Sequence, residues 1–326
     1  MNSRRDFIKK IGGSAVLAPG ILSTAPVSAL ASGKQGQKPI RIGIIGAENS
    51  HTIGYGKMFN VDKKFPGMEV KYVWGETEAL AKAAVEKGGI PAMVKDPSEM
   101  LGKIDALIVD HRHAKYHLEA AKPFVEAKIP TFIDKPFCYR VEEGKKFLAM
   151  ARQLGTPVTS YSGLAHSADT LDIKSQVESL GAINHVVSFG PVDINSVWGG
   201  VFFYGIHLVE PLMYIFGEDI KKVRVTRNDK NATADLAFGN GMLATLIFLN
   251  QTYKFEMYAE TKGGIVPLKA RVEEREPGKA YQEMVDMFRT GKEPRSHQSI
   301  LKTIAVLEAL ERSVESQQWE EIICLR

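Results

Sequence analysis

The chain reads RIGIIGAENSHT from Arg41 to Thr52. An apolar run ends at Gly46, where a parallel strand would turn into a helix. Dinucleotide-binding folds carry the pattern G-x-G-x-x-G at such a turn. Gly46 holds the first glycine position, whereas Glu48 and His51 stand at the second and third. The stretch therefore predicts a strand–turn–helix unit whose loop departs from the usual phosphate-binding sequence.

Strand-like and helix-like segments alternate after this turn. The stretch DALIVD (residues 105–110) is continuously apolar at its centre, as expected of a strand buried on both faces. Strands are expected at 40–45, 69–74, 105–110, 130–134 and 156–161, and helices at about 50–61, 77–88, 117–127 and 141–154. This alternation predicts an α/β fold with a doubly wound parallel sheet, a Rossmann domain over residues 38–160.

The pattern changes in the second half of the chain. A helix is expected at 169–181 and another at about 300–316, with alternating strands at 183–192, 221–228, 233–240 and 242–250. Gly239 and Asn240 form a hairpin signal between two of these strands. Residues 161–326 are therefore predicted to form an α+β domain with a mostly antiparallel, open sheet.

The first 31 residues differ in composition from the rest. Paired Arg4 and Arg5 precede a modest apolar segment and small residues suited to cleavage, which resembles a twin-arginine export signal. The apolar segment is interrupted by glycines and is shorter than the about 20 residues that span a bilayer. We expect a signal peptide over residues 1–31, export to the periplasm by the twin-arginine machinery, and no stable membrane anchor.

Composition excludes one broad class of function. The 326 residues are 44% hydrophobic and 25% charged, as in globular proteins with a real core, and the net charge is only +4. No Lys/Arg run is interleaved with aromatic residues, so no nucleic-acid partner is predicted. The two cysteines, Cys138 and Cys324, lie far apart in the sequence and are expected to be unpaired, although an oxidising compartment would permit pairing.

Several motifs after the first strand occur in a known order. Lys135, in the stretch DKPF, follows the carboxyl end of a buried strand. Doubly wound folds bind their ligands in the crevice at the carboxyl ends of the strands. His117 precedes that strand, and the segment GGVFFYGIHLVEPLMYIFG runs from Gly199 to Gly217. In order and spacing these motifs resemble the glucose–fructose oxidoreductase/inositol dehydrogenase (Gfo/Idh/MocA) family of sugar dehydrogenases. The resemblance covers nearly all of the chain after the signal segment.

The resemblance implies roles for individual residues. Lys135 would be the catalytic lysine beside the transferred hydride, and His207 the acid/base that binds the substrate. Tyr204, a third candidate catalytic residue, stands where the family usually has aspartate and would not be a carboxylate at neutral pH. Asp134 replaces the usual glutamate before the lysine, and Glu210 replaces an aspartate after the histidine, so both keep their charge.

The resemblance also implies a nicotinamide cofactor. Glu48 would crowd and repel a pyrophosphate, whereas Asn49, Ser50 and a protonated His51 would donate to it. Glu76, beyond the second strand, is suited to accept from ribose hydroxyls, which favours NAD over NADP. The predicted cofactor-binding residues are Gly46, Glu48, Asn49, Ser50, His51, Glu76, His117, Asp134 and Lys135.

The residues predicted to contact the substrate are His166, Asp169, Trp198 and Glu210. A metal site can also be drawn from Asp110, His111 and His113, because carboxylate and imidazole suit zinc or a similar ion. A polar pocket for sugar hydroxyls accounts for the same residues, and no metal is predicted.

The sequence thus predicts an exported NAD(P)-dependent oxidoreductase that acts on a sugar, polyol or sugar derivative and forms a homodimer or homotetramer. Two alternatives remain. One is an enzyme of the same family that uses NAD transiently to hydrolyse, eliminate or epimerise a glycoside. The other is a carbohydrate-binding protein that has lost redox chemistry.

Overall fold

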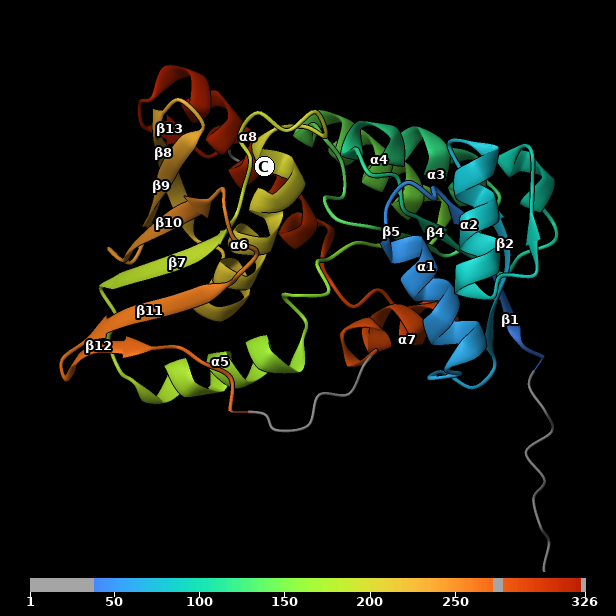
Figure 1. The fold of residues 1–326 in the computed structure, drawn as a ribbon, viewed down its shortest axis with the longest axis horizontal. Helices are drawn as coiled ribbons and strands as arrows, with labels where there is room; N and C mark the ends of the chain where they lie inside the picture. Colours follow the sequence, from blue (N-terminus) through green and yellow to red (C-terminus); the bar gives the residue numbers. More distant parts are fainter. Residues whose placement is uncertain (1–37, 272–277, 324–326) are drawn as a thin grey trace, which may run out of the picture. The chain divides into compact units, whose positions relative to one another are not determined.

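The first half of the chain forms a parallel sheet flanked by helices (Figure 1). The computed structural model describes residues 38–271 and 278–323, so the predicted signal peptide and Cys324 lie outside the described residues. The strands are β1 (Ile40–Ile45), β2 (Met68–Trp74), β3 (Ala92–Met93), β4 (Ala106–Val109), β5 (Thr131–Ile133) and β6 (Val158–Thr159). Their order is β3-β2-β1-β4-β5-β6 and every pair is parallel. The predicted doubly wound sheet is confirmed.

The helices of this half are α1 (His51–Gly56), continued by a π-helical segment (Lys57–Val61), α2 (Glu78–Gly88), α3 (His117–Glu126) and α4 (Val141–Leu154), with 3₁₀ turns at Pro97–Met100 and Ala114–Tyr116. The sequence explains their ends. The Thr77 side chain caps α2 by accepting from the N–H of Leu80 (3.2 Å), and Gly89 ends that helix in the left-handed conformation. Gly155 ends α4 in the same way.

The second half is a mixed sheet covered by helices. Its strands are β7 (His185–Pro191), β8 (Ile220–Asn228), β9 (Asn231–Phe238), β10 (Leu243–Leu249), β11 (Glu256–Thr261), β12 (Gly264–Pro267) and β13 (Glu320–Glu321), in the order β12-β11-β7-β10-β9-β8-β13. Only the β7–β10 pair is parallel. The predicted turn at Gly239 and Asn240 joins β9 to β10. The mostly antiparallel second sheet is therefore confirmed.

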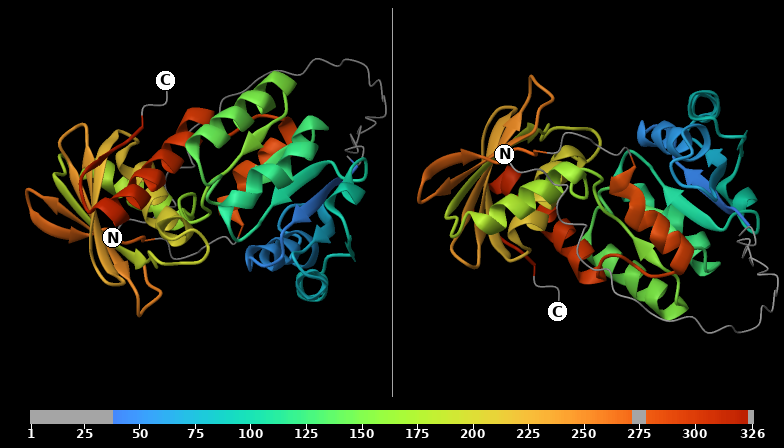
Figure 2. Two further views of the ribbon diagram at one scale, coloured as in Figure 1. Left: turned by 90° about the horizontal axis from the view of Figure 1, so that it is seen from above. Right: turned by 90° about the horizontal axis from the view of Figure 1, so that it is seen from below.

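The remaining helices are α5 (Ala168–Ser179), α6 (Val201–Phe216), α7 (Gln282–Thr290) and α8 (His297–Ser316), with a 3₁₀ turn at Lys279–Tyr281. Figure 2 shows α6 and α8 along one face of the second sheet. Within the described residues, no helix is long and apolar enough to cross a bilayer.

Helix α7 returns to the first sheet. Its side chains Met284, Val285 and Phe288 are buried in one hydrophobic cluster with Ile42 of β1 and Tyr55 of α1. Figure 1 shows α7 beside α1, far in sequence but close in space. Residues 38–326 form one compact unit by their contacts, and a division between residues 160 and 161 stays a prediction.

Candidate active site

The loop between β1 and α1 keeps its first glycine for a steric reason. Gly46 has a φ of +110°, and a Cβ there would lie 2.6 Å from the backbone carbonyl of Asp110. A side chain at this position would therefore force β1 and β4 apart at their carboxyl ends. The neighbouring Glu48 is half-buried, Asn49 is buried, and Ser50 is exposed at the start of α1.

The carboxylate of Glu76 closes this loop from the end of β2. Its Oε2 accepts hydrogen bonds from the backbone N–H groups of Ala47 (2.8 Å) and Glu48 (2.9 Å). Its Oε1 lies 2.8 Å from Nδ1 of His111. Burial acts to raise the pKa of Glu76, but the bonds from His111 and Ala47 outweigh burial and lower it. The carboxylate lies where a ribose acceptor is expected, and its ribose contact stays a prediction.

Two buried aspartates meet beneath the loop. The amide Nδ2 of Asn49 donates to Oδ1 of Asp110 (2.9 Å) and to Oδ2 of Asp134 (3.2 Å). The hydroxyl of Thr52 lies 2.7 Å from the carbonyl of Gly46 and 2.5 Å from Oδ2 of Asp110. One hydroxyl has one proton, so the second of these contacts needs a proton from Asp110. Burial, followed by the charge of Asp134, raises the pKa of Asp110 in agreement with this geometry.

Asp134 is the ionised member of the pair. The Nζ of Lys135 lies 3.4 Å from its Oδ2, Nδ1 of His51 lies 3.1 Å from the same oxygen, and Tyr55 donates to Oδ1 (3.2 Å). Burial acts to raise the pKa of Asp134, but the charges of Lys135 and His51 outweigh burial and lower it. Four predicted site residues thus meet in one network above Gly46, namely Asn49, His51, Asp134 and Lys135.

Helix α6 supplies the other wall of the site. Nδ1 of His207 lies 2.9 Å from the hydroxyl of Ser162, and the backbone N–H of Ser162 donates to Glu210 (2.8 Å). Arg295 forms an ion pair with the other oxygen of Glu210. Burial, followed by the charge of Lys135, lowers the pKa of His207, so this histidine is neutral at physiological pH. The ring of Tyr204 packs edge-on against His207, 5.4 Å between centroids.

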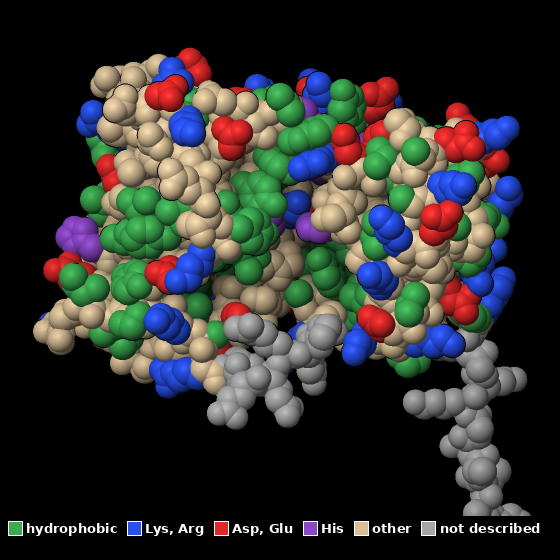
Figure 3. Space-filling model, viewed as in Figure 1, with side chains coloured by type: hydrophobic (Ala, Val, Ile, Leu, Met, Phe, Trp, Pro, Cys, Tyr) green, Lys and Arg blue, Asp and Glu red, His purple; other side chains and the backbone are tan. Residues whose placement is uncertain are grey.

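A crevice of about 610 Å³ joins these two walls. In Figure 3 the surface is hollowed between the two halves, and Lys, Arg and His side chains gather in the hollow. The residues that line the crevice are Glu48, Asn49, Ser50, His51, Arg112, Lys135, Gly163, Leu164, Ser167, Phe203, Tyr204, His207, Tyr253, Phe255, Ala280 and Tyr281. All three predicted catalytic residues are among them, and their catalytic roles stay predictions.

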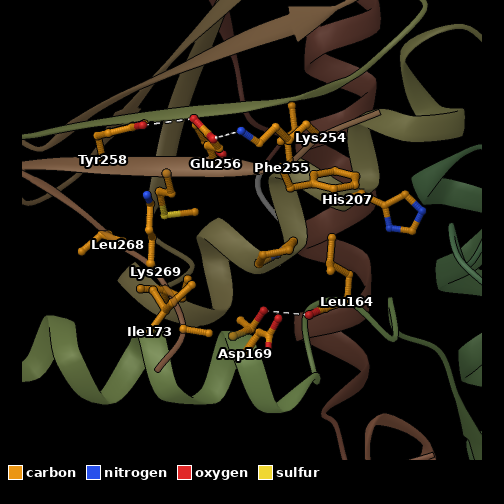
Figure 4. A pocket seen from close by; sticks show the side chains of 17 residues that line it. Leu164, Asp169, Ile173, His207, Lys254, Phe255, Glu256, Tyr258, Leu268 and Lys269 are labelled. Carbon is orange, nitrogen blue, oxygen red and sulfur yellow. Dashed lines mark hydrogen bonds and ion pairs between the residues drawn. The ribbon is translucent and has the colours of Figure 1, made fainter. Parts of the chain in front are cut away.

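A second cavity of about 380 Å³ adjoins the crevice, and Figure 4 shows it between α5, α6 and β11. Leu164, His207 and Phe255 line both spaces. In Figure 4, Leu164 and Phe255 lie beside His207 at one end of the cavity. The walls of this second cavity are mainly aliphatic, with charged side chains such as Lys254 and Glu256 among its lining residues.

Four predicted contacts with the substrate lie outside the crevice lining. His166 is buried, with its Nδ1 3.0 Å from Oε2 of Glu283 and its ring against Tyr161. Asp169 lines the second cavity. The ring of Trp198 lies under the guanidinium of Arg112. Both carboxylate oxygens of Glu210 are already engaged, as described above. The geometry therefore makes Glu210 a support for the Ser162–His207 contact rather than a group free to bind substrate.

His117 is also removed from the crevice. It is fully buried, with Nδ1 2.8 Å from the carbonyl of Pro136 and Nε2 2.8 Å from the carbonyl of His111. Burial lowers its pKa to about 4, while the two carbonyl acceptors act in the opposite direction because together they favour the protonated ring. Its contacts connect the loop after β4 to the loop after β5, which corrects the expectation that it touches the cofactor directly.

Arg112 is a crevice residue that the sequence did not single out. Its guanidinium lies 4.8 Å from the ring centroid of Trp198 and 5.1 Å from that of Phe203. Burial and then Glu76 raise the pKa of Glu48, while the charge of Arg112 acts in the opposite direction. The only signal available was the polar stretch DHRHAKYH itself, because the stacking rings come from residues about 90 positions later.

The metal site considered from the sequence does not assemble. Asp110 bonds Asn49 and Thr52, His111 faces Glu76, and the ring of His113 packs against Tyr139. The side chains spaced closely enough for a metal, among the described residues, are His51, Asp110 and Asp134. The carboxylate oxygens of Asp110 and Asp134 already accept hydrogen bonds. A proton on Asp110 and the ammonium of Lys135 already offset the charge of the two carboxylates, so we assign no metal there.

The donor set fits a nicotinamide dinucleotide at two points and departs from it at a third. Glu76 fits a ribose diol, and the crevice beside Lys135 has room for a nicotinamide ring. Glu48, however, stands where a glycine normally admits the pyrophosphate. Arg112 supplies a cation in the same crevice that can offset this carboxylate.

Known proteins resemble this chain in sequence and in fold. Residues 40–162 match the family model described as the oxidoreductase family with an NAD-binding Rossmann fold, Gfo/Idh/MocA. The uncharacterized oxidoreductase YhhX of Escherichia coli K12 is 28% identical over 223 residues, which are 59% of this chain and 64% of that relative. The match to this curated relative thus spans less than two thirds of its length.

Solved structures share the fold over most of the chain. A putative myo-inositol dehydrogenase from Sinorhizobium meliloti 1021 has a TM-score of 0.71 and 16% identity, with 87% of this chain and 100% of that chain covered. The myo-inositol dehydrogenase of Lactobacillus casei, solved with NAD(H) and myo-inositol, has a TM-score of 0.72 and 16% identity, with coverage of 88% and 98%.

The predicted fold class is therefore confirmed, and the family match agrees with the predicted oxidoreductase class and nicotinamide cofactor. Residues 40–162 are similar to the NAD-binding Rossmann domains of the Gfo/Idh/MocA oxidoreductases, and the described chain as a whole has the fold of solved inositol dehydrogenases.

Proposed function

We propose that the protein is an NAD-dependent oxidoreductase that oxidises a CH–OH group of a sugar, polyol or sugar derivative, or reduces the corresponding carbonyl. The observation that carries this proposal is the meeting of Lys135 and His207, from opposite walls, at one polar crevice. The inositol dehydrogenase neighbours support a polyol substrate.

The cofactor would supply hydride transfer, and the chain's residues would handle the substrate's oxygen. Lys135, held beside Asp134, is suited to donate a hydrogen bond to the reacting oxygen and to stabilise a developing alkoxide. His207 has Nδ1 engaged by Ser162, so its other ring edge is the one available to a substrate hydroxyl. Rings of Phe203 and Tyr204 line the same crevice and exclude water from the sugar's apolar face.

The direct test is incubation of the purified protein with NAD⁺ and a panel of inositols, hexoses and glycosides, followed by absorbance at 340 nm. We expect reduction of NAD⁺ with at least one polyol. Mass spectrometry of acid-released small molecules is the companion measurement, because an assay that adds free NAD⁺ would not detect a cofactor that stays tightly bound to the protein. No nucleotide bound and no NAD⁺ reduced with any compound would reject the proposal.

One observation favours the carbohydrate-binding alternative. The amides of Ala47 and Glu48, which would face a phosphate, are bonded to Glu76. A protein that binds sugars in the crevice without a nucleotide would bind a polyol in calorimetry and show no nucleotide affinity. The same two experiments therefore separate the alternatives. Product analysis by NMR separates net oxidation from the family alternative of NAD-assisted elimination, hydrolysis or epimerisation.

We further propose export and self-association. The paired Arg4 and Arg5 support export through the twin-arginine machinery to the periplasm. The outward side chains of β10, among them Leu243, Ile247 and Leu249, are only half-buried on an open sheet face, which supports a homodimer or homotetramer. Light scattering after size exclusion tests the second point, and a monomer at micromolar concentration would reject it.

A further inference from the structure

The histidine of the glycine loop is hydrogen-bonded to a buried carboxylate. Nδ1 of His51 lies 3.1 Å from Oδ2 and 3.3 Å from Oδ1 of Asp134, and Asp134 is only 2% exposed. The His51 ring is one-third exposed and lines the crevice. An ionised carboxylate can only accept, so Nδ1 carries the proton and the Nε2 edge faces away from Asp134.

Asp134 is itself held in position on several sides. Tyr55 donates to Oδ1, while Asn49 donates to Oδ2 and ties Asp134 to the protonated Asp110. These contacts orient the carboxylate before any ligand binds. A histidine whose Nδ1–H is bonded to a buried, oriented carboxylate has the arrangement that lets an imidazole accept a proton at Nε2 and lets the carboxylate stabilise the resulting cation.

We propose that His51 is the general base that takes the hydroxyl proton during oxidation in this crevice, with Asp134 as its positioning residue. This inference rests on the proposed function. The hydroxyl proton moves to Nε2 of His51, the C–O bond becomes C=O, and the carbon loses a hydride to an oxidised nicotinamide nucleotide. The substrate thereby loses two electrons, and in the reverse direction the His51 imidazolium returns the proton.

His207 is less suited to the same step. Burial and the nearby positive charge of Lys135 favour its neutral form, and Ser162 rather than a carboxylate bonds its Nδ1. Among the residues that the structure describes, no carboxylate is hydrogen-bonded to His207, and Glu210 on the same helix is paired with Arg295. His207 therefore remains a hydrogen-bond partner for substrate, and Lys135 holds the reacting oxygen.

The first test is ¹⁵N NMR of the histidine rings in the resting protein at mildly alkaline pH, with His51 assigned by comparison with His51→Gln. We expect a protonated Nδ1 and an unprotonated Nε2 on His51. Asp134→Asn presents an amide N–H₂ to Nδ1 and should reverse that tautomer, whereas Asp62→Asn, at an exposed aspartate, should leave it unchanged. A protonated Nε2 in the wild-type protein would overturn the dyad, and this measurement decides even where Asp134→Asn does not fold.

The second test uses turnover with a substrate found as above. His51→Ala should lower kcat about a hundredfold or more with little change in NAD affinity, and added imidazole should restore kcat by about tenfold. The control His185→Ala removes an exposed histidine. Its kcat should equal that of the wild type and should not change when imidazole is added. If wild-type protein is active and His51→Ala keeps a kcat within about threefold of it, the role of His51 is overturned. The proposed function stands in that case, because the wild-type enzyme has shown it. An inactive wild type rejects the function, and the tautomer still decides the dyad.

Discussion

Replacing Lys135 with methionine tests the proposed mechanism most directly. The substitution keeps most of the aliphatic stem and removes the ammonium whose Nζ lies 3.4 Å from Asp134. Loss of one such group at a developing alkoxide typically lowers turnover on the order of a hundredfold, which corresponds to about 2.7 kcal/mol of transition-state stabilisation. We therefore expect Lys135→Met to turn over at least about a hundredfold more slowly and to bind cofactor nearly normally.

The same substitution also has a cost for folding that the contacts define. Removing one partner of a buried ion pair typically costs about 3–5 kcal/mol. Asp134 keeps donors from His51, Tyr55 and Asn49, so we expect the lower end of that range, about 3 kcal/mol. Asp134→Asn in the Lys135→Met background removes the buried anion that has lost its lysine, and should restore at least about 1 kcal/mol of the free energy of unfolding.

Urea unfolding followed by circular dichroism, calorimetry with NAD⁺ and single-turnover kinetics together check these values. The reasoning about catalysis would be refuted by full activity in Lys135→Met. The reasoning about the ion pair would be refuted if the double variant were less stable than Lys135→Met alone.

Four further predictions concern the loop, a buried histidine and the leader. Glu48→Gly should tighten NAD binding by about tenfold in calorimetry, since it removes bulk and negative charge from the phosphate position, and no binding to either form contradicts the cofactor assignment. Gly46→Ala should lower the free energy of unfolding in urea by more than about 2 kcal/mol, because of its positive φ and the 2.6 Å approach to backbone, and an unchanged midpoint contradicts this. The folded His117 binds a proton only near pH 4 and the unfolded one near 6.5, so stability should fall by up to roughly 3 kcal/mol as pH drops through that window, and His117→Gln should flatten the urea–pH profile there. Lysines in place of both Arg4 and Arg5 should leave precursor in the cytoplasm, measured by cell fractionation, and a normal periplasmic yield contradicts the twin-arginine assignment.

The first sheet was predictable because its physics is local. Apolar runs such as Ile40–Ile45 and Ala106–Val109 end at glycine or charged residues, and helices between them carry caps such as Thr77 and Gly89. The β11–β12 hairpin was missed because its stretch, EMYAETKGGIVP, has no clean alternation of apolar and polar residues.

The site was predictable only where chemistry sits in a recognisable motif. Lys135 and His207 were expected in one crevice and line it together. The proton on Asp110 depends on Thr52, 58 positions away, and the place of Arg112 depends on a ring 86 positions away. Such pairings arise when loops that follow different strands pack together. They cannot be predicted from the spacing of residues along the chain.

The return of α7 to the first core has a consequence for how the halves can be separated. A fragment that stops near Tyr161 would lack Met284, Val285 and Phe288, and their absence would leave part of the first hydrophobic cluster open to water. Chimeras that exchange the Rossmann half between relatives should therefore carry residues 279–290 with it. Helix α8 then follows directly from a segment packed in the first hydrophobic cluster, so the chain passes between the two halves more than once.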